Sequence, residues 1–98
     1  MITSKQRAFL RGKANDMDTI FQIGKGSITP ELTEAVREAL EKRELIKIHV
    51  LKNNADDKQQ IAEMLAERTG SIVVQVIGNM IVLFKYQRDA DKRKIELN

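Results

Sequence analysis

Apolar residues recur at helical spacing in the middle of the chain, at Leu32, Val36 and Leu40 and at the alanines between them. Intervals of three and four residues place such side chains on one face of a helix. Thr29 precedes the pattern as a capping residue, and Pro30 occupies the first helical position, where its missing N–H costs nothing. The sequence therefore predicts an amphipathic helix that begins at residue 30.

Two other segments have weaker helical patterns. One runs from Ser4 to about Ala14, and Thr3 and Gln6 have the spacing of a capping box at its start. The other runs from about Asp56 to Arg68. Gly70 is well placed to end it, because glycine readily adopts the left-handed conformation that follows many helices.

Four short runs rich in β-branched and aromatic residues predict strands, at residues 19–23, 45–51, 71–77 and 80–86. Alternation in the second run places Ile46, Ile48 and Val50 on one face of the sheet. Gly78-Asn79 separates the last two runs and predicts a tight hairpin.

The order of elements is α-β-α-β-α-β-β. A helix between two strands makes them parallel neighbours or near-neighbours, whereas a two-residue turn makes them antiparallel. We expect one α/β (α+β) domain at residues 1–88, with a four-stranded mixed sheet and three helices. A charged, loosely held tail is expected at residues 89–98.

Composition narrows the class of protein. A chain of 98 residues that is 42% hydrophobic is sufficient for one packed domain. The absence of cysteine excludes disulfides, thiolate metal sites and cysteine nucleophiles. No apolar run approaches the about 18 residues that a membrane helix needs, so we expect a cytoplasmic protein without a membrane partner.

The net charge of +3 is modest, but its distribution is uneven. Lys and Arg exceed Asp and Glu in residues 1–28 and 71–98, and acids predominate in residues 29–70. A basic field on one side of the domain follows if the two ends meet in space.

The turn Gly24-Lys25-Gly26-Ser27 lies between a predicted strand and the start of the central helix. Glycines let a phosphate approach the backbone, amides at a helix start favour anions, and Lys25 adds a cation. The spacing matches neither a nucleotide-triphosphate loop nor a dinucleotide fingerprint, since Thr29 stands where a third glycine is needed. A clamp on an RNA backbone and an ordinary turn both remain.

Several short motifs together resemble a known family. They are Lys5-Gln6-Arg7, Leu10-Arg11, Gln22-Ile23-Gly24-Lys25, Leu45-Ile46-Lys47, Gly70, Gln75-Val76-Ile77-Gly78 and Val82-Leu83. In this order they resemble the CRM domain, and more narrowly the stand-alone bacterial YhbY-like proteins. The resemblance implies an RNA-binding domain that associates with precursors of the large ribosomal subunit. It also implies the mixed sheet with three helices, a topology similar to the C-terminal domain of a bacterial translation initiation factor.

The sequence departs from the family's pattern at two places. The family's loop is usually G-x-x-G, whereas the fourth position here is Ser27. The family's last strand usually ends Val-Leu-Tyr-Arg, and here Phe84-Lys85 replaces the last two residues, so that the cation is retained.

The candidate RNA-binding residues fall into two groups that we expect to share one exposed side. The turn would hold the RNA backbone. The Lys and Arg side chains of the first helix, which has no acid before Asp16, would widen the contact, or they are only a helix face exposed to water. These residues are Gly24, Lys25, Gly26 and Ser27, with Lys5, Arg7, Arg11 and Lys13, and with Lys85 as a weaker candidate.

Aromatic residues are scarce, and Phe9 and Phe21 are expected in the core. Modules that stack single-stranded bases need exposed rings, so contacts with the backbone and shape of structured RNA are expected instead. The sequence predicts no DNA specificity and favours a monomer, although it leaves the oligomeric state open.

The alternatives are an enzyme and a protein-binding adaptor. With His49 as the single histidine and no convergent carboxylates, catalysis, metal sites and cofactors have no visible residues. Glu31, Glu34 and Glu38 on one helix are compatible with a site but are expected to face water. An adaptor without RNA contact would show a large exposed apolar patch and no salt-sensitive RNA binding.

Overall fold

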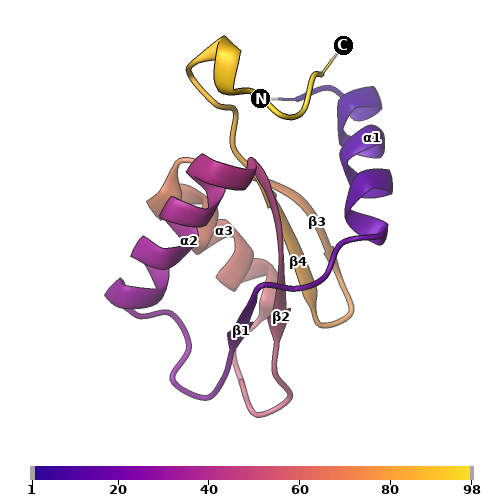
Figure 1. Ribbon diagram of the computed structural model, residues 1–98. Helices are drawn as coiled ribbons and strands as arrows, with labels where there is room; N and C mark the ends of the chain where they lie inside the picture. The colour runs from indigo at the N-terminus through magenta and orange to yellow at the C-terminus, as the bar shows by residue number, and fades with distance from the viewer. Residues whose placement is uncertain (1, 98) are drawn as a thin grey trace.

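The computed structural model describes residues 2–97 and has three α-helices and four strands in the predicted order (Figure 1). The predicted fold class is confirmed. The elements are α1 (Ser4–Asn15), β1 (Phe21–Ile23), α2 (Pro30–Arg43), β2 (Leu45–Val50), α3 (Lys58–Thr69), β3 (Ile72–Ile77), β4 (Met80–Phe84) and a 3-10 turn, η1 (Ala90–Lys92).

The four strands form one mixed sheet in the order β1-β2-β4-β3. β1 is parallel to β2, and β4 is antiparallel to both β2 and β3, so β2 and β3 are the expected parallel near-neighbours. β1 is shorter than predicted and starts at Phe21, although the Ile20 amide still donates to the Lys47 carbonyl at 3.0 Å. The register of β3 shifts between Val73 and Gln75, which is a β-bulge.

The sheet has a core on each face, because alternate residues of its strands point in opposite directions. Ile46, Ile48 and Val50 share one face as predicted, and they pack with buried residues of α2 and α3. Leu45 on the opposite face packs with Leu10 and Ala14 of α1. In Figure 1, α1 accordingly lies apart from α2 and α3.

The helix ends follow the capping residues that the sequence predicts. Thr3 and Gln6 form a capping box at the start of α1. The Leu32 amide donates to the Thr29 hydroxyl at 3.1 Å, with Pro30 first in α2. Gly70 ends α3 with a φ of +70°, in the left-handed region that favours glycine.

The C-terminal segment, which we define as residues 87–97, is held against the domain, so the expectation of a loosely held tail is wrong. Glu44, between α2 and β2, is only 1% exposed, and its carboxylate accepts the amides of Lys94 at 2.5 Å and Ile95 at 3.0 Å. Ile95 is itself buried in the core beneath α1. A buried carboxylate and an apolar anchor therefore fix the path of this segment.

Candidate nucleic-acid interface

The turn Gly24–Ser27 follows the last residue of β1 and lies at the lower end of the molecule in Figure 1. The Ser27 amide donates to the Gly24 carbonyl at 3.0 Å, which closes the turn. Lys25 and Gly26 are exposed, and within residues 2–97 their amides have no hydrogen-bond partner. The turn thus presents two amides and one cation to solvent, a combination that suits an anion.

Ser27 contributes to the turn through its backbone and not as a free donor. Its φ is +55°, in the left-handed region, so a serine adopts the conformation for which a glycine is usually needed. Its hydroxyl donates to the Asp56 carboxylate at 2.7 Å. Asp56 therefore occupies this hydroxyl and adds a negative charge on one side of the turn.

The cations of α1 lie on a different layer from the turn. α1 covers one face of the sheet, whereas the turn leads into α2 on the other face, and Figure 1 shows them apart. The expectation that both share one exposed side is therefore wrong. Sequence patterns place each group on its own element but do not fix which face of the sheet each helix covers.

Within α1 the four predicted bases have different surroundings. Lys5, Arg11 and Lys13 are exposed. Arg7 is half-buried, and its guanidinium donates to the carbonyls of two adjacent residues at the bulge of β3. It therefore supplies donors to backbone carbonyls at the irregular part of β3, which makes its first role structural.

The two phenylalanines predicted for the core have different positions. Phe9 is 47% exposed on α1, with the Lys13 ammonium 5.6 Å from its ring centre, so its core assignment is wrong. Phe21 is half-buried and packs against the core on the α2 side.

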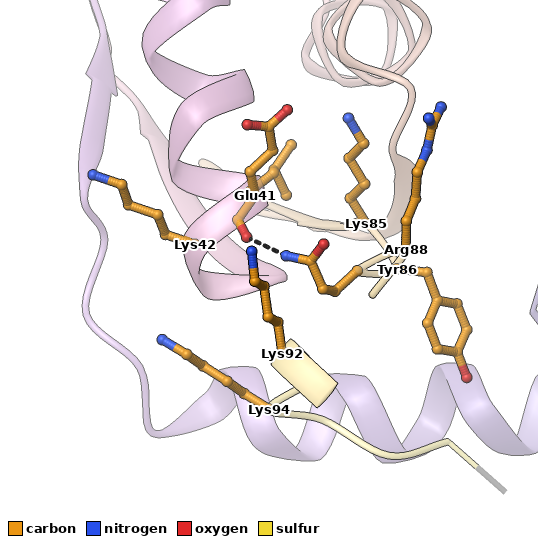
Figure 2. Close-up of a pocket in the computed structure, with 9 residues that line it drawn as sticks. Glu41, Lys42, Lys85, Tyr86, Arg88, Lys92 and Lys94 are labelled. Atoms are coloured by element: carbon orange, nitrogen blue, oxygen red, sulfur yellow. Dashed lines mark hydrogen bonds between the residues drawn. The ribbon is translucent and has the colours of Figure 1, made fainter. Parts of the chain in front are cut away.

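A basic groove, which the sequence did not predict as a unit, lies beside the C-terminal end of α2. It has a volume of about 870 Å³. Its charged lining consists of Lys42, Lys85, Arg88, Lys92 and Lys94, with Glu41 as the one acid. Figure 2 shows the Lys42 and Lys94 side chains extending in the same direction, with Lys92 beside them and directed toward Glu41.

The sequence contained only part of the signal for this groove. Lys85 was a candidate, and residues 71–98 carry five bases against three acids. Lys42 comes from a segment in which acids predominate, and the tail was expected to be loose. The groove exists because folding brings the tail beside α2.

Few cations of this chain are neutralised by carboxylates. Of the 17 Lys and Arg residues, Arg37 alone forms an ion pair within residues 2–97, with Glu34. Some others have structural hydrogen bonds, such as Lys47, whose ammonium donates to carbonyls at the end of α1. The cations at the turn, along α1 and in the groove have no carboxylate within 4 Å among the described residues.

The part of the chain that the structure describes has no group of three or more acidic, histidine or cysteine side chains arranged to hold a metal ion. Glu31, Glu34 and Glu38 are exposed on α2, as expected, and Glu34 pairs with Arg37. His49 is half-buried on β2. In residues 2–97, no helix combines the length and the apolar character that crossing a bilayer requires.

Comparisons of the sequence and of the structure with known proteins agree on one family. The family model of the CRS1/YhbY (CRM) domain matches residues 2–85. The chain belongs to the CRM domain family. This confirms the resemblance that the order of the sequence motifs indicated.

Relatives of this CRM domain are matched over nearly their whole length. The chain is 46% identical over 97 residues to "Probable RNA-binding protein YqeI" of Bacillus subtilis, covering 99% of each chain. It is 30% identical to "RNA-binding protein" of Haemophilus influenzae, covering 98% of this chain and 94% of that one. A hypothetical protein of Staphylococcus aureus, described as a candidate RNA-binding protein, has a solution structure that matches with a TM-score of 0.83 and 49% identity over the full length of both chains.

Two features stand out against the CRM family pattern. The positive φ of Ser27 shows that the serine in place of the usual glycine still adopts a glycine-like backbone conformation. The family match ends at residue 85, so the segment that completes the basic groove lies beyond the matched part.

Proposed function

We propose that this CRM domain, at residues 1–88, binds structured RNA, and that its target is ribosomal RNA in precursors of the large subunit. Two lines support the proposal: the relatives are named RNA-binding proteins, and nearly all Lys and Arg side chains lack a carboxylate partner in the described chain. The exposed turn with an unpaired Lys25 and two unbonded amides is the observation that carries it. The protein acts as a cytoplasmic assembly factor, without catalysis or cofactor, and as a monomer.

At the turn, a phosphate oxygen accepts the amides of Lys25 and Gly26 while the Lys25 ammonium supplies charge. Gly26 suits this position, because no heavy atom lies within 4 Å of where its Cβ would be, and the backbone is open to a ligand. Asp56 repels a phosphate from the Ser27 side. The phosphate is therefore expected on the Lys25 side of the turn.

The cations of α1 make a separate contact. Lys5, Arg11 and Lys13 are exposed and not neutralised, so they are suited to phosphates of a second RNA segment. Arg7 keeps its hydrogen bonds to β3 and so fixes α1 against the sheet. The proposal thus retains three of the four predicted helix bases as RNA contacts.

RNA recognition relies on contacts with the sugar-phosphate backbone and on the shape of the RNA more than on stacking with its bases. The exposed aromatic side chains are Phe9 and Tyr86, on different elements, and each has a cation at its ring, Lys13 and Arg93. A platform for stacking successive bases needs neighbouring open rings. Short unstructured oligonucleotides should consequently bind weakly.

The first test compares Lys25→Glu with Arg68→Glu in RNA binding over a salt series. Both residues are exposed and both changes alter the net charge equally, but Arg68 lies on α3, outside the turn, α1 and the groove. Lys25→Glu should weaken binding at least as much as Arg11→Glu does, and Arg68→Glu should have little effect. Equal affinities for the two variants Lys25→Glu and Arg68→Glu would remove the turn from the site.

A second experiment addresses the RNA target. The protein is crosslinked in cell extract, and the bound RNA and the sedimenting particle are identified. Enrichment of large-subunit ribosomal RNA in a particle lighter than the mature subunit is expected. Crosslinks spread over unrelated RNAs would refute the ribosomal assignment while leaving RNA binding intact.

The adaptor alternative has no observation in its favour. The large apolar side chains exposed in the described chain belong to different segments of the sequence, and no hollow is lined by two of them: Phe9, Ile20, Met64, Ile77 and Tyr86. Scattered apolar residues are normal on a protein surface and do not mark a docking patch.

A further inference from the structure

We propose that the basic groove between α2 and the C-terminal segment is a second binding site for phosphates of the RNA backbone, which the buried carboxylate of Glu44 assembles. The inference rests on RNA binding as proposed above. It adds a site at the opposite end of the sheet from the turn, formed largely by residues beyond the family match.

The charge of the groove is suited to a polyanion. Five cations line it against the single carboxylate of Glu41, and none of the five forms an ion pair in the described chain. Like charges gathered around one groove repel one another, and this repulsion is relieved when an anion binds. Lys42 and Lys94 come from different elements, so the charge results from folding.

The walls of the groove are fixed before any ligand arrives. Glu44 accepts the amides of Lys94 and Ile95, and the Gln87 side chain donates to the Glu41 carbonyl at 2.9 Å, a bond drawn as the dashed line at Glu41 in Figure 2. These contacts tie the C-terminal segment to the end of α2. A site whose parts are already ordered loses less conformational entropy on binding.

The cationic side chains near the groove differ in how far their charged groups already have partners or close neighbours. The Arg93 guanidinium lies 4.9 Å from the Tyr86 ring centre, and its Nε donates to the Gln87 carbonyl at 2.8 Å. Lys85 extends past Gly70, where an added Cβ would lie 4.0 Å from its Nζ, at the C-terminal end of α3. Arg93 is thus occupied, while Lys92 and Lys94 keep their ammonium groups exposed without a hydrogen bond within residues 2–97.

The position of the groove favours structured RNA as the ligand. The turn follows β1, which is parallel to β2, whereas Lys85 follows β4, which is antiparallel to β2, so the two sites lie at opposite ends of the sheet. The six residues of β2 alone span about 20 Å. One phosphate cannot reach both sites, but two backbone segments of a folded RNA can.

The test compares two double variants with the same change in net charge. Lys92→Gln with Lys94→Gln alters the groove, and Lys58→Gln with Arg68→Gln alters α3, outside the turn, α1 and the groove. The dissociation constant for an RNA hairpin is measured over a salt series for each. The logarithm of the binding constant falls with the logarithm of the salt concentration, and each phosphate contact contributes about 0.9 to the steepness of that fall. The groove variant should therefore have a slope that is shallower by about 2, and it should bind about tenfold more weakly or worse.

The role of Glu44 is tested with Glu44→Gln, alone and combined with the groove variant. Loss of the charged acceptor should shift the amide resonances of Lys94 and Ile95. It should weaken RNA binding in the natural chain but not in the Lys92→Gln, Lys94→Gln background, since the groove is already disabled there. A purely structural Glu44 would weaken both backgrounds equally.

The outcomes separate this inference from the function it rests on. If the natural chain does not bind the hairpin, the proposed RNA binding fails. If it binds, and the groove and α3 variants have the same salt slope, the groove is not a phosphate site and the inference alone is overturned.

Discussion

Replacement of the Glu44 carboxylate should destabilise the whole domain and not only the tail. The side chain is 1% exposed, and its Oε1 accepts two amides of the C-terminal segment, from Lys94 at 2.5 Å and Ile95 at 3.0 Å. The backbone of Glu44 also has a φ of +66°, which is strained for a residue with a Cβ. Glu44→Ala removes the acceptor and keeps the strain, whereas Glu44→Gly removes both.

The magnitude follows from the two amides. A hydrogen bond to an ionised group contributes about 1.5–3 kcal/mol, and a buried N–H without an acceptor costs about 1–3 kcal/mol. Ile95 is 8% exposed, so its amide stays unpaired, while Lys94 is exposed and its amide can bind water. Glu44→Ala should therefore lower the free energy of unfolding by about 2–4 kcal/mol. Glu44→Gly should recover about 1 kcal/mol of that loss by relieving the backbone strain.

Urea unfolding followed by circular dichroism measures these differences, and hydrogen exchange of the Ile95 amide reports on the local contact. Faster exchange at Ile95 should accompany the loss of stability. An unfolding free energy for Glu44→Ala within about 0.5 kcal/mol of the natural chain would refute the reasoning, because such a change is ordinary for a surface residue. Equal stability of the Ala and Gly variants would refute the argument from backbone strain and leave the argument from the two amides intact.

Three other predictions test local features by thermal unfolding. Lys47→Met should destabilise the domain by about 1–2 kcal/mol, because its ammonium donates to two carbonyls at the end of α1; an unchanged melting temperature would show that water replaces it. Ser27→Gly should be more stable than Ser27→Ala by about 1 kcal/mol, since only glycine adopts the positive φ without strain, and the reverse order would contradict the turn geometry. Gly12 lies in α1 with open space around an added Cβ, so Gly12→Ala should stabilise the domain by about 0.5–1 kcal/mol. Gly70 has a φ of +70°, so Gly70→Ala should destabilise the domain by about 1 kcal/mol. Shifts of the melting temperature in the same direction for both variants would contradict this contrast.

The sequence was sufficient for the fold because its signals are local. The helical spacing of Leu32, Val36 and Leu40, the capping residues Thr29 and Pro30, and the two-residue hairpin each act within a few positions. Strand ends were less well predicted, since β1 begins at Phe21 and not at Thr19. Where a strand ends depends on which neighbour offers hydrogen bonds, and that neighbour is distant in the sequence.

The candidate site was predicted only in part. The exposed turn at Lys25 and Gly26 is a local feature, and the structure has it where the motif indicated. The hydrogen bonds of Arg7 to the bulge of β3, and of the Ser27 hydroxyl to Asp56, join residues far apart in the chain. The spacing of residues in the sequence does not reveal such contacts. The exposure of Phe9 likewise depends on which side of α1 meets the sheet.

By itself, the sequence determined the order of elements, the helix caps and the turn, because each depends on residues close together in the chain. It also determined the family, because the order of motifs along the chain can be read without the fold. Tertiary structure decided that α1 and the turn lie on different layers and that Lys42 meets Lys94 in one groove. The physical reason lies in Glu44 and Ile95. The buried carboxylate of Glu44 needs donors, which the C-terminal segment some fifty residues away supplies, and the apolar Ile95 needs a core, which it finds with Leu10 of α1 and with the sheet.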